Sequence, residues 1–394
     1  MSLAAPKTET VIEVVILILA TILRATAAIL IPDQSSLLTD AISYRDTATE
    51  LLWHWHITNP YEMPLYPILI AIFGRGIGQL CADISLSVIS VWLVYALTNE
   101  LFANRYAAIF AAAAAACYPP LIFFSVVGLS ETLFIALVLA SFLLWYRKQF
   151  TSAAIFAVLA ILTRPIFDLF APLMIVVFAL VVHRLAWKQG LRHLAVYAVI
   201  YCILMMPWWL NNFEVYGTFV RLTPGAGIVL YAGNNPMNHS GGGNAGIDYE
   251  ADAFQEIADP VQRDAIAKKV ALAYIIEHPR HFFELAGLKF MRMWRPWPAN
   301  EGYKNLPTIL IAVLSFVPVL LLALGGVFLT RQIVRRIAPI LLFWIGYAAV
   351  HMILPATIRY RLPLEPFLLI FAGITLSYFV DPKLFKLTLV RDKE

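Results

Sequence analysis

Long runs of apolar residues alternate with short polar segments along almost the whole chain. Several of these runs approach the ~20 residues that a helix needs to cross a bilayer. The pattern predicts an all-α fold, a polytopic transmembrane helix bundle with ten spans. Their expected positions are about 12–31, 84–98, 106–120, 130–146, 151–164, 166–183, 193–210, 307–329, 337–355 and 362–380.

One further apolar run, 64–78, is interrupted by Gly74, Gly76 and Gly78 and contains Arg75. We interpret it as an interfacial or re-entrant helix, because counting it as a span would place the basic clusters outside, against the positive-inside rule. With ten spans and a cytoplasmic N-terminus, fourteen Lys and Arg residues are cytoplasmic and five lie in the short outer loops. The cytoplasmic set is Lys7, Arg105, Arg147, Lys148, Arg184, Lys188, Arg192, Arg331, Arg335, Arg336, Lys383, Lys386, Arg391 and Lys393, and the outer set is Arg45, Arg75, Arg164, Arg359 and Arg361.

This topology predicts a single membrane domain, 1–394, with two large segments on the periplasmic or extracellular side. The first, 32–83, is rich in aromatic and polar residues. The second, 211–306, contains three consecutive glycines at 241–243, which we expect to form a mobile lid, and an amphipathic stretch at about 250–293. The breaks in that stretch are expected near Pro260 and Pro279.

Composition agrees with an integral membrane protein, which we expect in a bacterial inner or plasma membrane. Of the 394 residues, 61% are hydrophobic and only 14% are charged, too few to cover the surface of a soluble domain of this length. The cysteines, Cys81, Cys117 and Cys202, are far apart, so we expect no disulfide framework or metal cluster. The net charge is only +4, and no nucleic-acid partner is expected.

Ionisable side chains are costly near a bilayer, so those that remain there are candidates for function. Carboxylates and guanidiniums from distant parts of the chain fall at the outer membrane face in the expected topology. Such a group suits an anionic lipid substrate and acid–base chemistry. The charged candidates are Asp40, Glu131, Arg164, Arg359 and Arg361.

The two acids and one further arginine have structural alternatives. Asp40 is also suited to an exposed loop or a helix N-cap. Glu131 is also suited to the positive end of a helix that begins near Ser130. Arg24 lies inside the first span near its outer end, and we expect it to snorkel to the interface rather than reach the site.

Two of the candidate arginines have an acid four residues on, the spacing of a helical ion pair. Arg164 precedes Asp168 in this way, and Arg361 precedes Glu365. Arg359 has no such neighbour and is therefore the freest of the three to meet a substrate.

Several short motifs follow one another along most of the chain. They are Asp40 with Tyr44, Pro64-Leu65-Tyr66-Pro67, Ser130-Glu131-Thr132-Leu133-Phe134, Leu162-Thr163-Arg164-Pro165, Pro207-Trp208-Trp209 with Asn211-Asn212, Gly233-Asn234-Asn235-Pro236, His278-Pro279 with Phe282 and Trp294, and Arg359-Tyr360-Arg361-Leu362-Pro363. In this order they resemble the GT-C type of membrane glycosyltransferase. More narrowly, they are similar to the protein O-mannosyltransferases and the aminoarabinose transferases of lipid A.

The resemblance implies transfer of a sugar from a polyprenyl-phosphate donor to a lipid, glycan or protein acceptor, with inversion at the anomeric carbon. Asp40 is then the catalytic base. Glu131 either orients the acceptor or holds a divalent cation together with Asp40. The chain has a single acid at 40 where many relatives show an acidic pair, so no cofactor is assigned beyond that cation.

The same resemblance assigns substrate contacts. Arginine binds two phosphate oxygens with its planar fork, so Arg359 is the first candidate for the lipid phosphate, followed by Arg361 and Arg164. Tyr44 is expected to contact substrate, and Asn234 and Asn235 to bond sugar hydroxyls. The competing interpretation is a transporter or flippase of lipid-linked sugars. The gathering of charges at one face and the lack of an internal repeat favour an enzyme.

Overall fold

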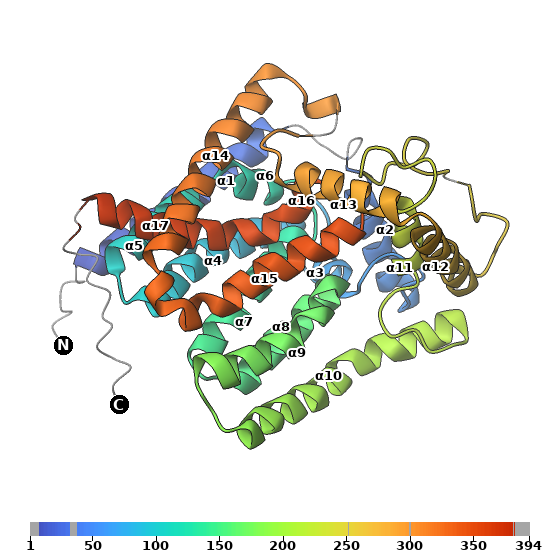
Figure 1. Ribbon diagram of the computed structural model, residues 1–394, viewed down its shortest axis with the longest axis horizontal. Coiled ribbons are helices and arrows are strands. Elements are labelled where there is room, and N and C mark those ends of the chain that lie inside the picture. Colours follow the sequence, from blue (N-terminus) through green and yellow to red (C-terminus); the bar gives the residue numbers. More distant parts are fainter. Residues whose placement is uncertain (1–7, 32–37, 251, 299–300, 381, 383–394) are drawn as a thin grey trace.

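The computed structural model describes residues 8–31, 38–250, 252–298, 301–380 and 382. Within these ranges all named secondary structure is helical (Figure 1). The predicted all-α membrane bundle is therefore confirmed. Five of the basic residues assigned to the cytoplasm, Lys7, Lys383, Lys386, Arg391 and Lys393, lie outside the described residues.

Six helical segments of the described chain are long and apolar enough to cross a membrane, fewer than the ten expected. Three of them lie within the first 216 residues, and the other three follow the second outer segment, 211–306. They are α1 (Thr8–Leu30), α4 (Ile77–Phe102), α10 (Trp187–Tyr216), α14 (Leu306–Leu329), α15 (Val334–Ile353) with the preceding turn η4 (Arg331–Ile333), and α17 (Glu365–Val380) with the preceding α16 (Ile358–Arg361) and η5 (Leu362–Leu364).

The other four expected spans are shorter apolar helices. Fourteen of the sixteen residues of α7 are buried inside the protein, so its apolar character reflects packing against other helices on all sides. A run of apolar residues does not by itself distinguish a helix in contact with lipid from one enclosed by its neighbours. The four are α5 (Arg105–Cys117), α7 (Glu131–Tyr146), α8 (Phe150–Thr163), and α9 (Ala171–Val176) continued by the π-helical η2 (Val177–Val182).

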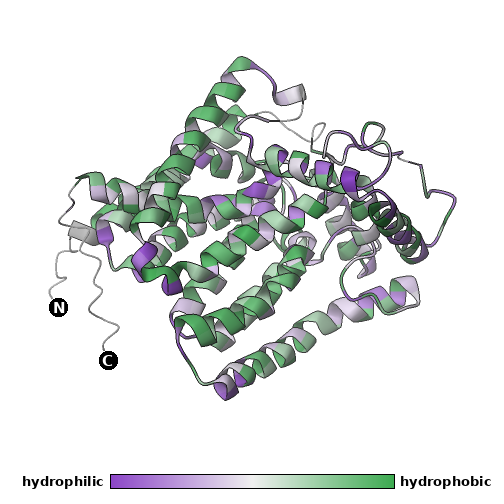
Figure 2. Cartoon of the chain, in the orientation of Figure 1, coloured by the Kyte–Doolittle hydropathy of each residue, from purple (hydrophilic) through white to green (hydrophobic). Residues whose placement is uncertain are grey.

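Close contacts between helices build the centre of the bundle around α17. A side chain on Gly373 of α17 would lie 2.4 Å from the carbonyl oxygen of Ala107 in α5, and one on Gly326 of α14 would lie 2.1 Å from that of Phe371. Only glycine permits such an approach of two backbones. At one edge of the bundle, α10 presents exposed apolar side chains along its length, among them Val199 and Ile203, and this face suits contact with lipid (Figure 2).

The first outer segment contains α2 (Thr39–His54) and α3 (Leu65–Phe73). At nine residues α3 is about 13 Å long, too short to span a bilayer. Gly74 and Gly76 then adopt positive φ angles of 84° and 71° and separate α3 from α4. The next span consequently begins at Ile77, seven residues earlier than the sequence indicated.

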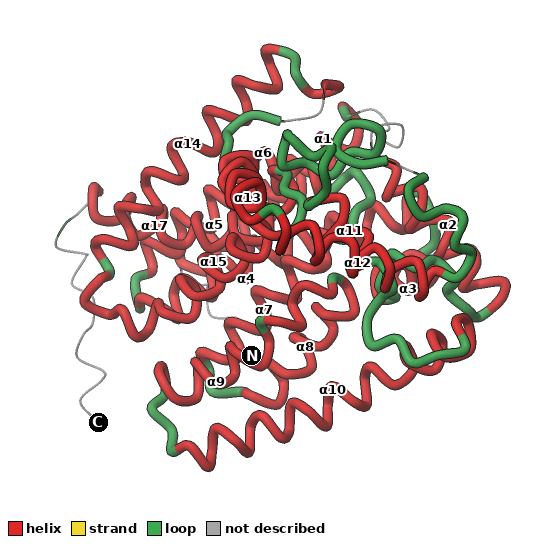
Figure 3. The backbone as a smooth tube through the Cα atoms, turned by 45° about the vertical axis from the view of Figure 1, so that its right-hand side comes forward, coloured by secondary structure: helices red, strands yellow, loops and turns green. Residues whose placement is uncertain are grey.

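The second outer segment contains α11 (Ala226–Gly233), α12 (Pro260–Glu277), α13 (Pro279–Trp294) and η3 (Glu301–Tyr303), and its long loops lie beside α2 and α11 (Figure 3). Pro260 and Pro279 each occupy the first position of a helix, where a missing N–H costs nothing. The glycines expected to form a lid pack closely in this structure. Gly241 accepts a hydrogen bond from the backbone N–H of Ala356 at 3.2 Å.

Candidate active site

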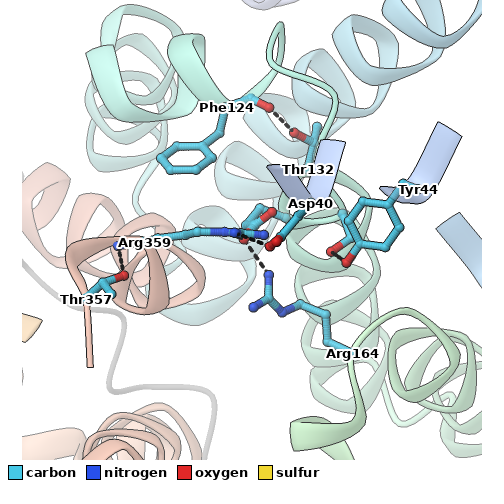
Figure 4. A network of polar contacts seen from close by, with 9 residues as sticks. Asp40, Tyr44, Phe124, Thr132, Arg164, Thr357 and Arg359 are labelled. Carbon is cyan, nitrogen blue, oxygen red and sulfur yellow. Dashed lines mark hydrogen bonds and ion pairs between the residues drawn. The ribbon is translucent and has the colours of Figure 1, made fainter. Parts of the chain in front are cut away.

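Four charged residues from four helical elements meet in one network of ion pairs, and Figure 4 labels three of them, Asp40, Arg164 and Arg359. Asp40 lies in the first turn of α2, Glu131 begins α7, Arg164 follows α8, and Arg359 lies in α16. Arg359 Nη1 donates to Asp40 Oδ2 at 2.6 Å, and its Nε donates to Glu131. Arg164 Nη1 donates to the same Glu131 oxygen at 2.5 Å. Residues separated by up to 319 positions thus form one ionic network.

Burial divides this network into an inner and an outer part. The side chain of Glu131 is fully buried and that of Arg359 is 19% exposed, whereas that of Asp40 is 53% exposed. A buried carboxylate needs close cationic partners, and Glu131 has two. The formal charges of the four residues, Asp40 included, sum to zero. The inner three, Glu131, Arg164 and Arg359, carry a net charge of +1. An anion could therefore take the place of Asp40 on Arg359 without leaving the cluster unbalanced.

Tyr44 stands one helical turn after Asp40 and supports the start of α7. Its hydroxyl shares a 3.0 Å hydrogen bond with Ser130 Oγ, and its ring meets the edge of Tyr66 with a 5.0 Å centroid separation. Burial raises the pKa of Tyr44 to about 12, so the phenol stays neutral at physiological pH. The hydroxyl therefore fixes the residue that precedes Glu131 through a neutral hydrogen bond.

The two arginines predicted to have helical partners behave differently. Asp168 pairs with Arg221 at 2.7 Å, so the i, i+4 interpretation of Arg164 is wrong. Arg361 does pair with Glu365, at 2.7 Å, and both side chains are almost completely buried.

Arg361 makes further contacts that attach the second outer segment to the bundle. Its Nη1 donates to the carbonyl oxygens of Met293 and Arg295 at 3.0 and 2.9 Å, and its guanidinium lies 3.5 Å from the ring centroid of Phe316. These contacts are all made within the protein. They hold the end of α13 against α16 and α14.

The expectation that Arg24 snorkels to the interface is wrong. Its side chain is fully buried between α1, α4 and α5. Nε donates to Ser87 Oγ at 2.7 Å, and Nη1 donates to the carbonyl oxygens of Ala20 and Ala116 at 3.1 Å each. Arg24 therefore satisfies its donors inside the bundle instead of at the membrane surface.

Asn234 and Asn235 are also buried, and their amides hold the chain after α11 in place. Asn234 Nδ2 donates to the carbonyl oxygens of Leu230 and Ile353, and its Oδ1 accepts from Lys289 Nζ at 3.1 Å. Asn235 likewise bonds backbone groups through both ends of its amide. These bonds position the backbone beside the site, and the sugar contact expected of the two asparagines remains a prediction.

Two buried ionisable groups in the outer segments escaped the sequence analysis. Burial lowers the pKa of Lys289 to about 8, and its Nζ donates to the carbonyl oxygen of Ile353 at 2.8 Å. Glu62 is only 7% exposed, and burial raises its pKa to about 7. The position of Glu62 directly before Met63-Pro64 and an apolar helix was the available signal for a buried acid.

The two acids considered as metal ligands share Arg359 instead. Among the described residues no group of three or more Cys, His, Asp or Glu is arranged to hold a metal ion. Asp40 and Glu131 are each bonded to the same guanidinium. As they lie, these donors do not form a cation site.

A basic group gathers at the opposite end of α7. Tyr146, the last residue of α7, donates from its hydroxyl to the carbonyl oxygen of Arg336 at 2.7 Å, and Arg147 pairs with Glu100 at 3.3 Å. Sixteen residues of helix separate this group from Glu131, about 24 Å. The acid–arginine network and two of the basic residues assigned to the cytoplasm, Arg147 and Arg336, thus lie at opposite ends of α7.

No protein-family model and no curated protein matches this sequence. Solved structures do match. The crystal structure of the Archaeoglobus fulgidus oligosaccharyltransferase tethered with an acceptor peptide aligns over 97% of this chain, with a TM-score of 0.56 and 15% identity. The fold is shared with an archaeal oligosaccharyltransferase. The predicted GT-C type of fold is thereby confirmed.

Two further structures of the oligosaccharyltransferase show the same likeness of fold. The apo form gives a TM-score of 0.53 over 93% of this chain at 14% identity. The complex with an inhibitory peptide and a dolichol-phosphate gives 0.51 over 96% at 16% identity. This chain spans about half the length of each matched structure, 51%. At such identities the likeness establishes the fold alone.

Proposed function

We propose that this protein is a glycosyltransferase that moves a sugar from a polyprenyl-phosphate-linked donor to an acceptor at the outer face of the membrane. The observation that carries the proposal is the pair of arginines held by the buried Glu131 beside the half-exposed Asp40. The shared fold adds support, because a matched oligosaccharyltransferase structure contains a dolichol-phosphate.

The donor phosphate would bind to Arg359 in place of Asp40. Arg359 is held from the inside by its Nε bond to Glu131, so its terminal nitrogens keep their orientation when Asp40 leaves. Guanidinium groups bind phosphate oxygens in a planar, bidentate manner and remain charged at any physiological pH. Arg164, bonded to the same carboxylate, adds a second positive charge next to the phosphate.

Displacement from Arg359 leaves the Asp40 carboxylate free to act as a base. In the transfer step Asp40 takes the proton of the acceptor hydroxyl while the acceptor oxygen attacks the anomeric carbon. The bond between that carbon and the phosphate oxygen breaks, and the polyprenyl phosphate leaves with the bonding electrons. A single displacement of this kind inverts the anomeric carbon and passes through an oxocarbenium-like state. Arg359 and Arg164 stabilise the charge that develops on the phosphate.

Single-turnover transfer from a polyprenyl-phosphate sugar tests this assignment. Asp40→Asn keeps the shape of the side chain but removes the base, so transfer should slow on the order of a hundredfold or more while donor binding persists. The control is Glu284→Gln, an exposed acid of α13 that pairs with Arg280 four residues before it. It should transfer at the parent rate.

The products distinguish the proposal from a transporter. Mass spectrometry should find the sugar on the acceptor together with free polyprenyl phosphate. Donor moved across a vesicle membrane without cleavage would refute the enzyme assignment. Near-normal turnover of Asp40→Asn would show that Asp40 is not the catalytic base.

A further inference from the structure

An open groove of about 550 Å³ runs along α2, and one of its lining residues, Thr39, directly precedes Asp40 of the ionic network. One side of it is a row of polar residues on α2, spaced so that they share one face of the helix. The loop that follows α2 forms the other side. The helix contributes Thr39, Ser43, Thr47 and Glu50 to the lining, and the loop contributes Thr58 and Asn59.

Hydroxyl and amide groups form the surface of this groove. The Asn59 amide donates to Ser43 Oγ at 2.8 Å and to Thr47 Oγ1 at 3.5 Å. The hydroxyls of Ser43 and Thr47 in turn hydrogen-bond the Glu62 side chain, so a ligand would meet their oxygens as acceptors. Glu62 lies against the same two hydroxyls, almost fully buried. Its Oε2 has no hydrogen-bond partner among the described residues. Glu62 is not among the residues that line the groove, and its bonds to Ser43 and Thr47 fix these hydroxyls from inside the protein.

The mixture of groups indicates the class of ligand. Hydroxyl oxygens, an amide and carboxylates can each pair with the vicinal hydroxyls of a sugar. Only Ile42 adds a large apolar side chain to the lining, and peptide recognition would call for apolar pockets or a free strand edge. Asp46 is paired with Arg75 at 3.1 Å, and Glu50 adds a second carboxylate to the lining. The Glu50 charge disfavours a phosphorylated or uronic-acid ligand.

Position along α2 indicates which substrate occupies the groove. Thr39 lines its near end, and the next residue is Asp40, whose carboxylate points to Arg359. The base therefore stands between the groove and the arginines that would take the donor phosphate. Direct displacement requires the acceptor oxygen, the anomeric carbon and the leaving phosphate oxygen to lie in line, with the base within hydrogen-bond reach of the acceptor hydroxyl.

We propose that the groove along α2 binds the acceptor, and that the acceptor presents a neutral, polyhydroxylated carbohydrate to Asp40. This inference rests on the proposed glycosyltransferase function. It narrows the acceptor from a lipid, glycan or protein to a molecule that carries a sugar at the attacked position.

Binding without turnover gives the first test. Saturation-transfer NMR of the purified full-length protein in detergent would use the methyl glycosides of glucose, mannose, galactose and N-acetylglucosamine together with a neutral maltooligosaccharide. At least one probe should bind. The double variant Ser43→Ala/Glu50→Gln should weaken its binding roughly tenfold, because one hydrogen bond to a charged group and one to a neutral group are lost.

A matched control exists on the same helix. Thr49→Val removes a hydroxyl of α2 that bonds the carbonyl oxygen of Arg45 and does not line the groove. It should bind the sugar probe like the parent. In transfer assays the double variant should raise the KM for the acceptor and leave donor affinity unchanged, with thermal unfolding showing that the fold is kept.

Several results would overturn the inference, and they differ from failure of the enzyme assignment. Absence of binding across the sugar panel, or equal binding by the double variant, removes the carbohydrate site. If the double variant loses donor affinity while its KM for the acceptor is unchanged, the groove binds the sugar of the donor instead. If a peptide competes with the bound probe and sugars do not, the acceptor is a protein. Sugar binding without any transfer would instead refute the glycosyltransferase proposal and leave the carbohydrate site standing.

Discussion

Arg359 and Arg361 are two residues apart, and the structure predicts opposite consequences for the same substitution. Arg359 uses two nitrogens at once, Nη1 for Asp40 and Nε for Glu131. Lysine carries one ammonium at the end of a flexible chain, so Arg359→Lys can keep the bond to Glu131 or bind phosphate, but not both. We expect this variant to bind donor weakly and to transfer slowly.

The size of the loss follows from the number of bonds. A hydrogen bond to a charged group contributes about 1.5–3 kcal/mol, and 1.36 kcal/mol corresponds to a factor of ten in rate. Losing one such bond in the transition state should slow single-turnover transfer by roughly ten- to a hundredfold. Arg359→Ala loses both and should be slower still, with weaker donor binding.

Arg361→Lys is the matched control because its guanidinium is buried and bonded to the protein. The charge stays near Glu365, but the bonds to the carbonyl oxygens of Met293 and Arg295 are lost. Thermal unfolding should therefore occur at a lower temperature, while donor affinity and the rate per folded molecule stay at parent values. Donor titration followed by single turnover measures all of these quantities.

The opposite pattern would refute the reasoning. If Arg361→Lys loses donor affinity while Arg359→Lys binds and transfers normally, the phosphate has been assigned to the wrong arginine. If neither substitution changes binding or rate, the phosphate site lies elsewhere, and Arg164 becomes the next residue to examine.

Two buried acids give further predictions. Glu131→Gln leaves the guanidiniums of Arg164 and Arg359 without their shared carboxylate, so denaturant unfolding should show a loss of about 3–5 kcal/mol, and parent-like stability would contradict the network. Burial, together with the nearby Asp40 and Asp46 charges, raises the pKa of Glu62 from 4.5 to about 7. The native state therefore favours protonated Glu62, and its stability falls as the pH rises from about 4.5 to 7. Glu62→Gln should match the parent near pH 4 and exceed it above pH 7 by on the order of 3 kcal/mol in thermal or denaturant unfolding, and equal stability at both pH values would show that Glu62 is not buried.

The sequence predicted the class of fold well because apolar runs and the lengths of helices are local properties. It could not predict how many runs face lipid. α7 and α10 are both apolar, yet α7 is enclosed and α10 is exposed along its length, a difference set by their neighbours in space. Arg24 illustrates the same limit. Its position near a span end suggested the interface, but Ser87 and the backbone carbonyl of Ala116, both in other helices, receive its donors.

The membership of the candidate site was easier to predict than its connections. Asp40, Glu131 and Arg359 were singled out because charge is costly at a membrane face, and the structure places them in contact. That Arg359 joins the two acids could not be predicted, since Asp40 and Arg359 are 319 positions apart. Glu62 was overlooked because burial of an acid in a polar-looking loop depends on how α2 and that loop fold together.

The different behaviour of the two candidate i, i+4 pairs has a local cause that the sequence did contain. Arg361 has helical backbone angles, φ −75° and ψ −23°, so Glu365 lies on its side of the turn and the two pair. Arg164 is followed by Pro165, and the proline ring disfavours a helical conformation in the residue before it. Arg164 is accordingly extended, with φ −145° and ψ 119°, and its side chain leaves the turn that carries Asp168. The Arg-Pro sequence thus ends α8 and directs this guanidinium to Glu131, whereas an uninterrupted helix would have brought Arg164 to Asp168 and left Glu131 with a single buried partner.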